Sequence, residues 1–266
     1  MQGLIKSISR NVIARTRPIR YVLDSFLYKL FADPAPLKAL HNKYKDKPLI
    51  VVGNGPSLNN TPLDSFVGVP SIGMNKIDLI YSRTEWRPSV VVCLNNLVAR
   101  QHQDVFVNSE LPVFVAWKAR WLLKARNRSR LAYFNTTLSN HFSKNAVEGF
   151  GSSATVTYIA LQLAYWMGAN PVILLGVDHS FKYTGEKRTY QKRDGDDVNH
   201  FDPNYFKSGS YWGTPDLEQS EIEYQMVKDA FENDSRSVFD ATVGGKLNVF
   251  EKIGIDQALV IVEKHK

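Results

Sequence analysis

The segment PLIVVGNGPSL, residues 48–58, runs from a short apolar stretch directly into a glycine-rich turn. An unbroken apolar stretch of this length is typical of a strand buried on both faces of a parallel sheet. Glycines after such a strand let the backbone approach a ligand, and the amides of the turn can hold phosphate. The turn is neither GxGxxG nor a P-loop, because no Gly-Lys-Ser/Thr follows it. The segment therefore predicts the first strand of an α/β sheet, followed by a ligand-binding or a purely structural turn.

Further apolar stretches and two helical patterns extend the same architecture along the chain. Residues 153–167 are apolar on nearly all sides of a helix, which predicts a buried helix, whereas residues 218–232 are amphipathic. Strands that alternate with helices indicate an α/β fold of Rossmann-like type, with a mostly parallel sheet in three layers. We expect the other strands at residues 71–74, 89–94, 112–116 and 171–177.

The composition fits a folded protein and excludes several classes. The chain has 266 residues, of which 44% are apolar and 22% charged, as is ordinary for a protein with a core. No apolar stretch approaches the ~20 residues that a membrane-spanning helix needs. The single cysteine, Cys93, excludes an internal disulfide. We therefore expect neither a membrane-spanning protein, nor a disulfide-stabilised scaffold, nor a disordered chain.

The net charge of +7 resides in the N-terminal segment. Residues 1–48 contain ten lysines and arginines against three aspartates, whereas the other 218 residues contain 23 basic and 23 acidic side chains. A nucleic-acid groove would need a charge excess in the body, so the pattern argues against nucleic acid as a partner. We predict a basic amphipathic helical arm with its linker at residues 1–47 and a Rossmann-like catalytic domain at residues 48–266.

The predicted arm consists of two short amphipathic helices that break at Pro18. In the first of them, Leu4 and Ile8 share one face, while Lys6 and Arg10 lie roughly opposite. A basic face opposite a bulky apolar face is typical of a helix that lies on an anionic membrane surface. We therefore expect residues 1–33 to contact a membrane, or alternatively to pack against the body or a second copy of the chain in a homo-oligomer.

The segment at about residues 181–216 is polar, aromatic and rich in glycine, and it shows no regular period. A loop of this length inside a compact domain is usually a binding loop or a lid. We therefore expect a lid over the ligand site.

Polar groups follow the predicted strands, where ligands of open parallel sheets bind. At the start of the buried helix, amides, serine hydroxyls and the helix dipole would form an anion site. Each group also has a structural alternative, namely a tight turn, an asparagine cap or an ordinary serine N-cap. The candidates are Asn54, Gly55, Ser57, Asn75, Asn95, Gly151, Ser152 and Ser153.

Together these features resemble the bacterial sialyltransferases of the Campylobacter type, glycosyltransferase family 42. The shared features are the GNGPSL turn, an asparagine after each of the next two strands, the Gly-Ser opening of the buried helix, and an apolar strand that ends in Gly176-Val177-Asp178. The resemblance runs from about Pro48 to Phe250 and extends to the MptE-like proteins of the domain of unknown function 115.

The resemblance implies an inverting glycosyltransferase without a metal or another cofactor. It would move a sugar, with sialic-acid-like sugars among the candidates, from a nucleotide-activated donor to a cell-surface glycan or glycolipid acceptor. Such an enzyme would be cytoplasmic, on the inner face of the bacterial plasma membrane. The eight candidates above would surround the donor. Lid tyrosines would contact the leaving phosphate, namely Tyr183, Tyr190, Tyr205 and Tyr211.

The general base of that family is a lid histidine, and here the sequence departs from the pattern. The family places it just before the helix that follows the lid, where this chain has Trp212-Gly213-Thr214-Pro215. We expect His200, earlier in the lid, to deprotonate the acceptor hydroxyl, with His179 and Asp178 as ligand contacts or positioning groups. The cluster at Asp194–Asp197 is expected to be a solvated run of charge and not a metal site.

Two other functions stay open at this point. The first is an MptE-like, Mg²⁺-dependent pyrophosphokinase that acts on a hydroxymethylpterin, which would give Asp178 and the Asp194–Asp197 cluster a metal-binding role. The second is a non-catalytic module that only binds a nucleotide.

Overall fold

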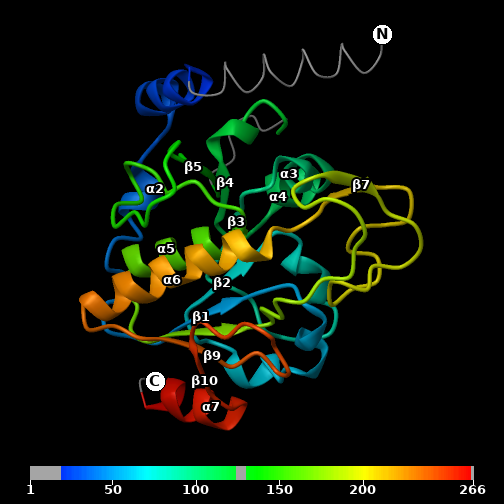
Figure 1. Ribbon diagram of the computed structural model, residues 1–266. Coiled ribbons are helices and arrows are strands. Elements are labelled where there is room, and N and C mark those ends of the chain that lie inside the picture. The colour runs from blue at the N-terminus through cyan, green and yellow to red at the C-terminus, as the bar shows by residue number, and fades with distance from the viewer. Residues whose placement is uncertain (1–18, 124–129, 265–266) are drawn as a thin grey trace.

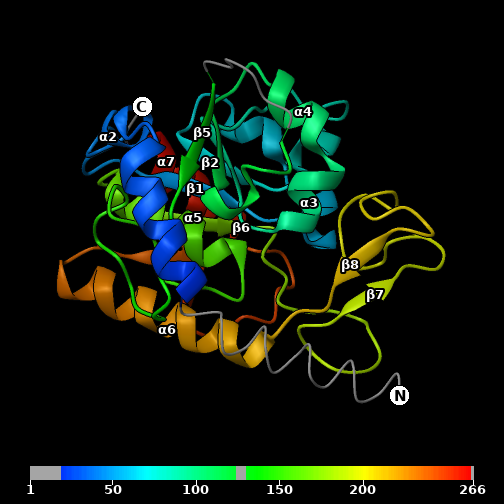
Figure 2. The same cartoon turned by 90° about the horizontal axis from the view of Figure 1, so that it is seen from above.

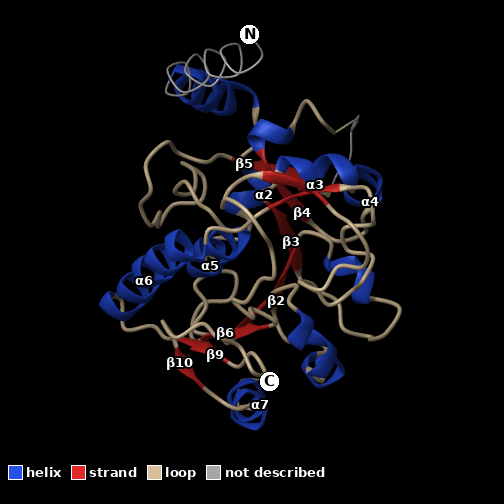
Figure 3. Cartoon of the chain, turned by 45° about the vertical axis from the view of Figure 1, so that its right-hand side comes forward, coloured by secondary structure: helices blue, strands red, loops and turns tan. Residues whose placement is uncertain are grey.

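The centre of the protein is an eight-stranded sheet, seen in a computed structural model that describes residues 19–123 and 130–264. Neighbouring strands are all parallel, in the order β10-β9-β6-β1-β2-β3-β4-β5 (Figures 1 and 3). The predicted Rossmann-like α/β fold is thereby confirmed. The strands are β1 (Leu49–Val52), β2 (Ser71–Met74), β3 (Val90–Cys93), β4 (Val113–Ala116), β5 (Leu131–Phe134), β6 (Val172–Leu175), β9 (Val238–Asp240) and β10 (Glu251–Lys252).

Helices and short 3₁₀ turns cover both faces of the sheet and complete the three layers (Figures 1 and 2). Leu49 and Val51 of β1 pack in a core shared with α5 (Val156–Trp166) and α6 (Leu217–Asn233). Their neighbours Ile50 and Val52 point the other way, as alternation along a strand requires. The opposite layer contains α3 (Asn96–Gln101), α4 (Gln103–Asn108), α7 (Ile255–Glu263), η1 (Pro56–Asn60), η2 (Leu63–Phe66) and η3 (Ile77–Ile80).

The order of the strands reverses at β1, which lies between β2 and β6. From β1 to β5 the chain moves steadily toward one edge, and it then returns to the other side of β1 as β6. At such a reversal the connections on either side leave in opposite directions and open a crevice at the carboxyl ends of the strands. The topology therefore places the turn at residues 53–58 and the segment after β6 next to each other.

The structure corrects several predicted boundaries and adds elements that local patterns missed. The buried helix begins at Val156 and not at residue 153, because the hydroxyl of Thr155 accepts the backbone N–H of Thr157 and caps it. Strands β5, β9 and β10 were not predicted: β9 and β10 have only three and two residues, and the apolar stretch of β5 was missed. Their place in the sheet comes from tertiary pairing.

The segment at residues 181–216, for which we keep the name lid, is a long excursion between β6 and α6. Its regular structure is a short antiparallel pair, β7 (Tyr190–Lys192) and β8 (Tyr211–Gly213) (Figure 2). Asp216 then caps α6, its carboxylate accepting the N–H of Gln219.

The N-terminal segment contacts the body along much of its described length. Residues 19–31 are helical, whereas the first predicted helix of the arm lies outside the described residues. After α2 (Ala35–Lys38), the chain runs beside the end of α5, where the indole N–H of Trp166 donates to the carbonyl of Leu37. Leu37 and Leu40 are buried in the core of the body. No helix within the described residues is both long enough and apolar enough to cross a membrane.

Candidate functional site

A cavity of about 410 Å³ lies at the carboxyl ends of β1, β2, β3 and β6, beneath the excursion at residues 181–216. Its wall brings together most of the residues predicted from the sequence, although they come from six separate segments of the chain. The predicted residues that line it are Asn54, Gly55, Asn75, Asn95, Ser153, Asp178, His179, Tyr190, His200 and Tyr205. Those that lie outside its wall are Ser57, Gly151, Ser152, Tyr183 and Tyr211.

The floor of the cavity is a close backbone contact between the turns that follow β1 and β6. The amide of Gly53 donates to the carbonyl of Leu175 at 2.7 Å, and the amide of Gly55 donates to that of Gly176 at 2.9 Å. A Cβ on Gly53 would lie 2.2 Å from the oxygen of Gly176, well inside any permitted contact. Glycine is thus required here because two backbones meet at the switch point.

Asp178 joins these two turns through its side chain. One carboxylate oxygen accepts the N–H of Ser57 at 3.0 Å, and the other accepts its hydroxyl at 2.5 Å. A Cβ on Gly55 would lie 1.8 Å from this carboxylate, so Gly55 makes the space that Asp178 occupies. Asp178 and the buried Ser57 therefore shape the site by holding its floor together.

Three carboxamide oxygens in the cavity wall have no hydrogen-bond donor among the described residues. They belong to Asn54 after β1, Asn75 after β2 and Asn96 after β3, and all three atoms are buried. Neighbouring Asn95 is different, because its side-chain oxygen accepts the N–H of Leu97 and caps α3. A buried acceptor without a donor costs free energy, about 1–3 kcal/mol each. Three of them in one wall indicate a site built to receive hydrogen-bond donors.

The start of α5 is already partly occupied by a carboxylate from α6. Glu223, which is 1% exposed, accepts the hydroxyl of Ser153 at 2.7 Å and the amide of Ala154 at 2.9 Å. The amides of Gly151 and Ser152 donate to Gln162 and Ser139, so they do not face the cavity as anion donors. Ser153 and Ala154 line the cavity here, and Glu223 holds the hydroxyl and the amide that the sequence suggested would be open.

Burial raises the pKa of Glu223 above its ordinary value of 4.5 and outweighs the hydrogen bonds from Ser153 and Ala154. The folded protein thus favours the neutral acid. We expect the free energy of unfolding of the wild type, relative to Glu223→Gln, to fall as pH rises from about 4.5 through the raised pKa and then to level off. Urea unfolding of both proteins across this window measures the difference, with the exposed Glu232→Gln as the matched control. A difference that stays constant with pH would contradict this expectation.

His200 forms a pair with a buried aspartate of the lid. Its Nδ1 lies 2.8 Å from the carboxylate of Asp197, whose side chain is 1% exposed and also faces Arg193 at 3.7 Å. The ring stacks on Tyr205, with centroids 4.0 Å apart. Burial alone would raise the pKa of Asp197, but the hydrogen bond and charge of His200 hold it below its usual value. Asp197 is therefore an ionised partner that orients the imidazole.

Sequence reasoning placed Asp197 in a solvated run of charge and missed this pairing. The available signal was the spacing of three residues between Asp197 and His200.

His179 has a different partner: its Nε2 lies 2.9 Å from Glu221 of α6, and its backbone has a positive φ of 52°. Both histidines line the cavity, His179 from just before the segment at residues 181–216 and His200 from within it.

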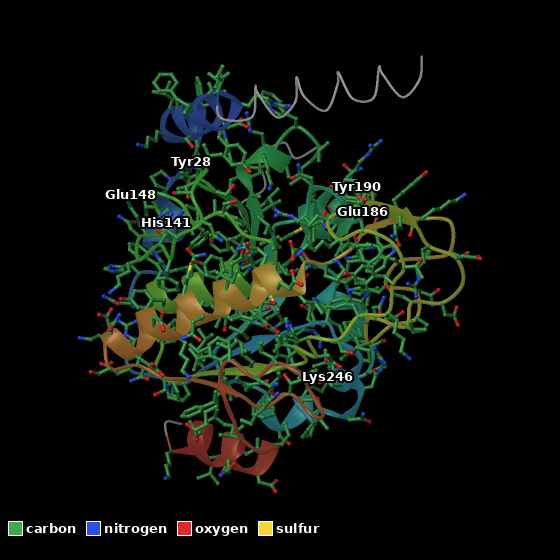
Figure 4. All side chains as sticks on the ribbon, in the orientation of Figure 1. Tyr28, His141, Glu148, Glu186, Tyr190 and Lys246 are labelled. Atoms are coloured by element: carbon green, nitrogen blue, oxygen red, sulfur yellow. The ribbon has the colours of Figure 1, made fainter. Side chains whose placement is uncertain are left out.

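The four predicted tyrosines lie in different surroundings. Tyr205 is buried beneath His200, while Tyr190 projects from the lid with 67% of its surface exposed (Figure 4). Tyr183 lines a neighbouring hollow with Arg193 and Trp212, and Tyr211 is exposed on β8.

Two cations that the sequence did not single out reach the cavity wall. Lys118 follows β4 and Arg188 lies in the lid, and both side chains are exposed. They supply positive charge for an anionic ligand. Within residues 19–123 and 130–264, no group of three or more histidine, cysteine or acidic side chains is placed to hold a metal ion.

The parallel sheet, the switch point and the cavity above it define a Rossmann-like α/β protein. No known protein family and no curated protein matches the sequence. Among solved structures, the chain is similar to MAf glycosyltransferase from Magnetospirillum magneticum AMB-1, with a TM-score of 0.51 and 13% sequence identity. The similarity covers 81% of this chain but 35% of that protein, so this chain spans about a third of its length. The comparison confirms the fold.

Proposed function

We propose that this protein is a glycosyltransferase that takes a sugar from a nucleotide-activated donor. The observation that carries the proposal is that one cavity contains both buried acceptors without donors and a histidine that an aspartate holds in place. The wall presents unpaired carboxamide oxygens, and the base is His200 backed by Asp197. The structural similarity to a glycosyltransferase supports it.

The wall suits a nucleotide sugar because that ligand combines many donors with negative charge. Ribose and sugar hydroxyls and the amino or imino groups of a base can donate to Asn54, Asn75 and Asn96. Phosphate carries the charge that Lys118 and Arg188 would meet.

The proposed reaction is a direct displacement at the anomeric carbon. Asp197 accepts the Nδ1–H of His200, which leaves Nε2 with the lone pair that takes the proton of an acceptor hydroxyl. The acceptor oxygen bonds to the anomeric carbon as the bond to the leaving phosphate breaks, so the configuration inverts. The ionised Asp197 then stabilises the imidazolium. A glycan or glycolipid hydroxyl is the proposed acceptor, and a sialic-acid-like sugar on a cytidine nucleotide is one specific donor.

Nucleotide binding is the first test of this function. We expect the melting temperature to rise with one nucleotide among CMP, CDP, UDP and GDP, with no requirement for Mg²⁺, because a ligand that binds only the folded state stabilises it. A shift with CMP would direct the search to cytidine-activated acidic sugars. A shift with ATP that requires Mg²⁺ would instead support a pyrophosphokinase and overturn the proposal.

A variant of the wall sharpens this test. Asn96→Leu removes an unpaired buried oxygen, so we expect the ligand-free protein to keep or raise its melting temperature. The same change removes an acceptor for the nucleotide, so affinity measured by calorimetry should fall about 10-fold. Asn204→Leu, an exposed change in the lid, is the matched control. Unchanged affinity in Asn96→Leu would remove this side chain from the site.

A further inference from the structure

Three side chains of the helix at residues 19–31 attach it to the body, and they lie on one side of the helix. Asp24 accepts a hydrogen bond from Arg120 at 2.7 Å, and the hydroxyl of Ser25 accepts one from Asn135 at 3.1 Å. Tyr28 is buried on the same side, and burial raises its pKa to about 12 (Figure 4). These contacts determine which side of the helix faces away from the protein.

The side that faces away is apolar. Val22 is 68% exposed, Leu23 54%, Phe26 57% and Leu30 58%. At about 100° per residue, these four side chains fall within an arc of roughly 100°, opposite Asp24 and Tyr28. We call these four side chains the arm face. An apolar stripe of this kind normally turns toward the core, so its outward position indicates a surface that another apolar phase covers.

The charged residues beside the arm face indicate what covers it. Arg20 and Lys29 are exposed and lie on opposite sides of the arm face, roughly 60° and 20° beyond the ends of its arc. Asp24 is already paired with Arg120, so the exposed charge beside the arc is positive. A second copy would bring like charges together, whereas anionic headgroups would pair with them while the acyl region takes up the apolar side chains.

We propose that the arm face lies in the surface of an anionic lipid membrane. Trp121, 80% exposed, extends the apolar surface from the neighbouring η4 turn (Trp117–Ala119), because Arg120 lies over its ring at 4.8 Å and also holds Asp24. Indole rings are enriched where membrane meets water.

The attachment also connects the membrane surface to the cavity. In the same η4 turn, Trp117 contacts Tyr28 with ring centroids 5.6 Å apart, and the next residue, Lys118, lines the cavity. In combination with the proposed transferase function, on which this step alone rests, this geometry favours a lipid-linked acceptor. Lipid binding itself does not depend on that function.

The experiment is co-sedimentation of the full-length protein with vesicles of phosphatidylcholine, with and without phosphatidylglycerol. We expect binding to the anionic vesicles that weakens as salt rises, and a loss of about 10-fold or more in Val22→Asp/Phe26→Asp. The matched control is Ile222→Asp/Val260→Asp, which changes two apolar residues of α6 and α7 that are 52% and 50% exposed. This control should bind like the wild type.

Two results would overturn the proposal. One is unchanged vesicle binding by the Val22/Phe26 variant. The other is a dimer, seen by light scattering of the wild type without lipid, that this variant alone dissociates; that result would assign the arm face to a second copy. Melting temperatures verify that both variants fold. Nucleotide binding, measured in parallel, separates a failure of this proposal from a failure of the transferase function.

Discussion

Replacing His200 with asparagine is expected to reduce sugar transfer about 10²–10⁴-fold while donor binding stays close to that of the wild type. Asparagine can still donate from Nδ2 to Asp197, so the buried carboxylate keeps a partner and the lid keeps its fold. It cannot accept a proton as the imidazole does. The loss should therefore appear in kcat and not in nucleotide affinity.

Asp197→Asn should impair the same proton transfer indirectly, through the contact of residue 197 with Nδ1 of His200. An asparagine in this position no longer fixes Nδ1–H, so the imidazole loses its preferred tautomer and the ionised partner that stabilises the imidazolium. We expect at least a 10²-fold loss in kcat. His141→Asn, a histidine outside the cavity that bonds to Ser139, is the matched control (Figure 4). Full activity in His200→Asn would remove His200 as the base.

The second large effect is expected from Gly53→Ala, a change of one methyl group. The new Cβ would lie 2.2 Å from the carbonyl oxygen of Gly176 and 2.6 Å from its carbonyl carbon, and neither atom belongs to a side chain that could rotate away. The turns after β1 and β6 would have to separate. We expect a loss of about 3 kcal/mol in the free energy of unfolding, measured in urea, together with the loss of nucleotide binding.

The matched control for this change is Gly254→Ala. A Cβ on Gly254 would have its nearest neighbour at 3.8 Å, and the backbone φ of −75° is ordinary for any residue. Gly254 is the N-cap of α7, where alanine is a poorer cap than glycine, so we expect a loss of about 1 kcal/mol or less. If Gly53→Ala were as stable as Gly254→Ala, the tight contact at the switch point would be refuted.

Some of the strands can be predicted from the local sequence, and others cannot. The predicted strands at residues 48–52, 71–74 and 171–177 match β1, β2 and β6 because a strand buried on both faces must be apolar throughout. Strand β10 is charged and exposed, so it has no such pattern, and β5 is an apolar stretch of only four residues whose burial alternates. These edge strands follow from their neighbours, and no local pattern in the sequence predicts them.

The same division holds in the candidate site. Asn54 and Asn75 were identified from their positions after apolar strands, since parallel strands end at one edge of the sheet. The role of Asp197 was not identified, because it depends on how the segment that contains both Asp197 and His200 folds and buries this carboxylate. The contact of Glu223 was not identified either, because Glu223 lies on a helix about 70 residues after the start of α5 that it contacts.

Residue pattern alone was thus sufficient for the parallel sheet, the irregular segment at residues 181–216 and the edge of the sheet where the polar candidates gather. Periodicity and strand ends are local properties, and they are repeated in every fold of this type. Tertiary packing decided which polar atoms are left without partners, which carboxylate orients His200, and which side of the helix at residues 19–31 faces away from the body. The unpaired atoms and the outward side of the helix depend on groups far apart in the chain, whose hydrogen bonding and burial are determined only when the segments meet in space. Asp197 and His200 are only three residues apart, but the burial of this pair also depends on how the whole segment packs against the body.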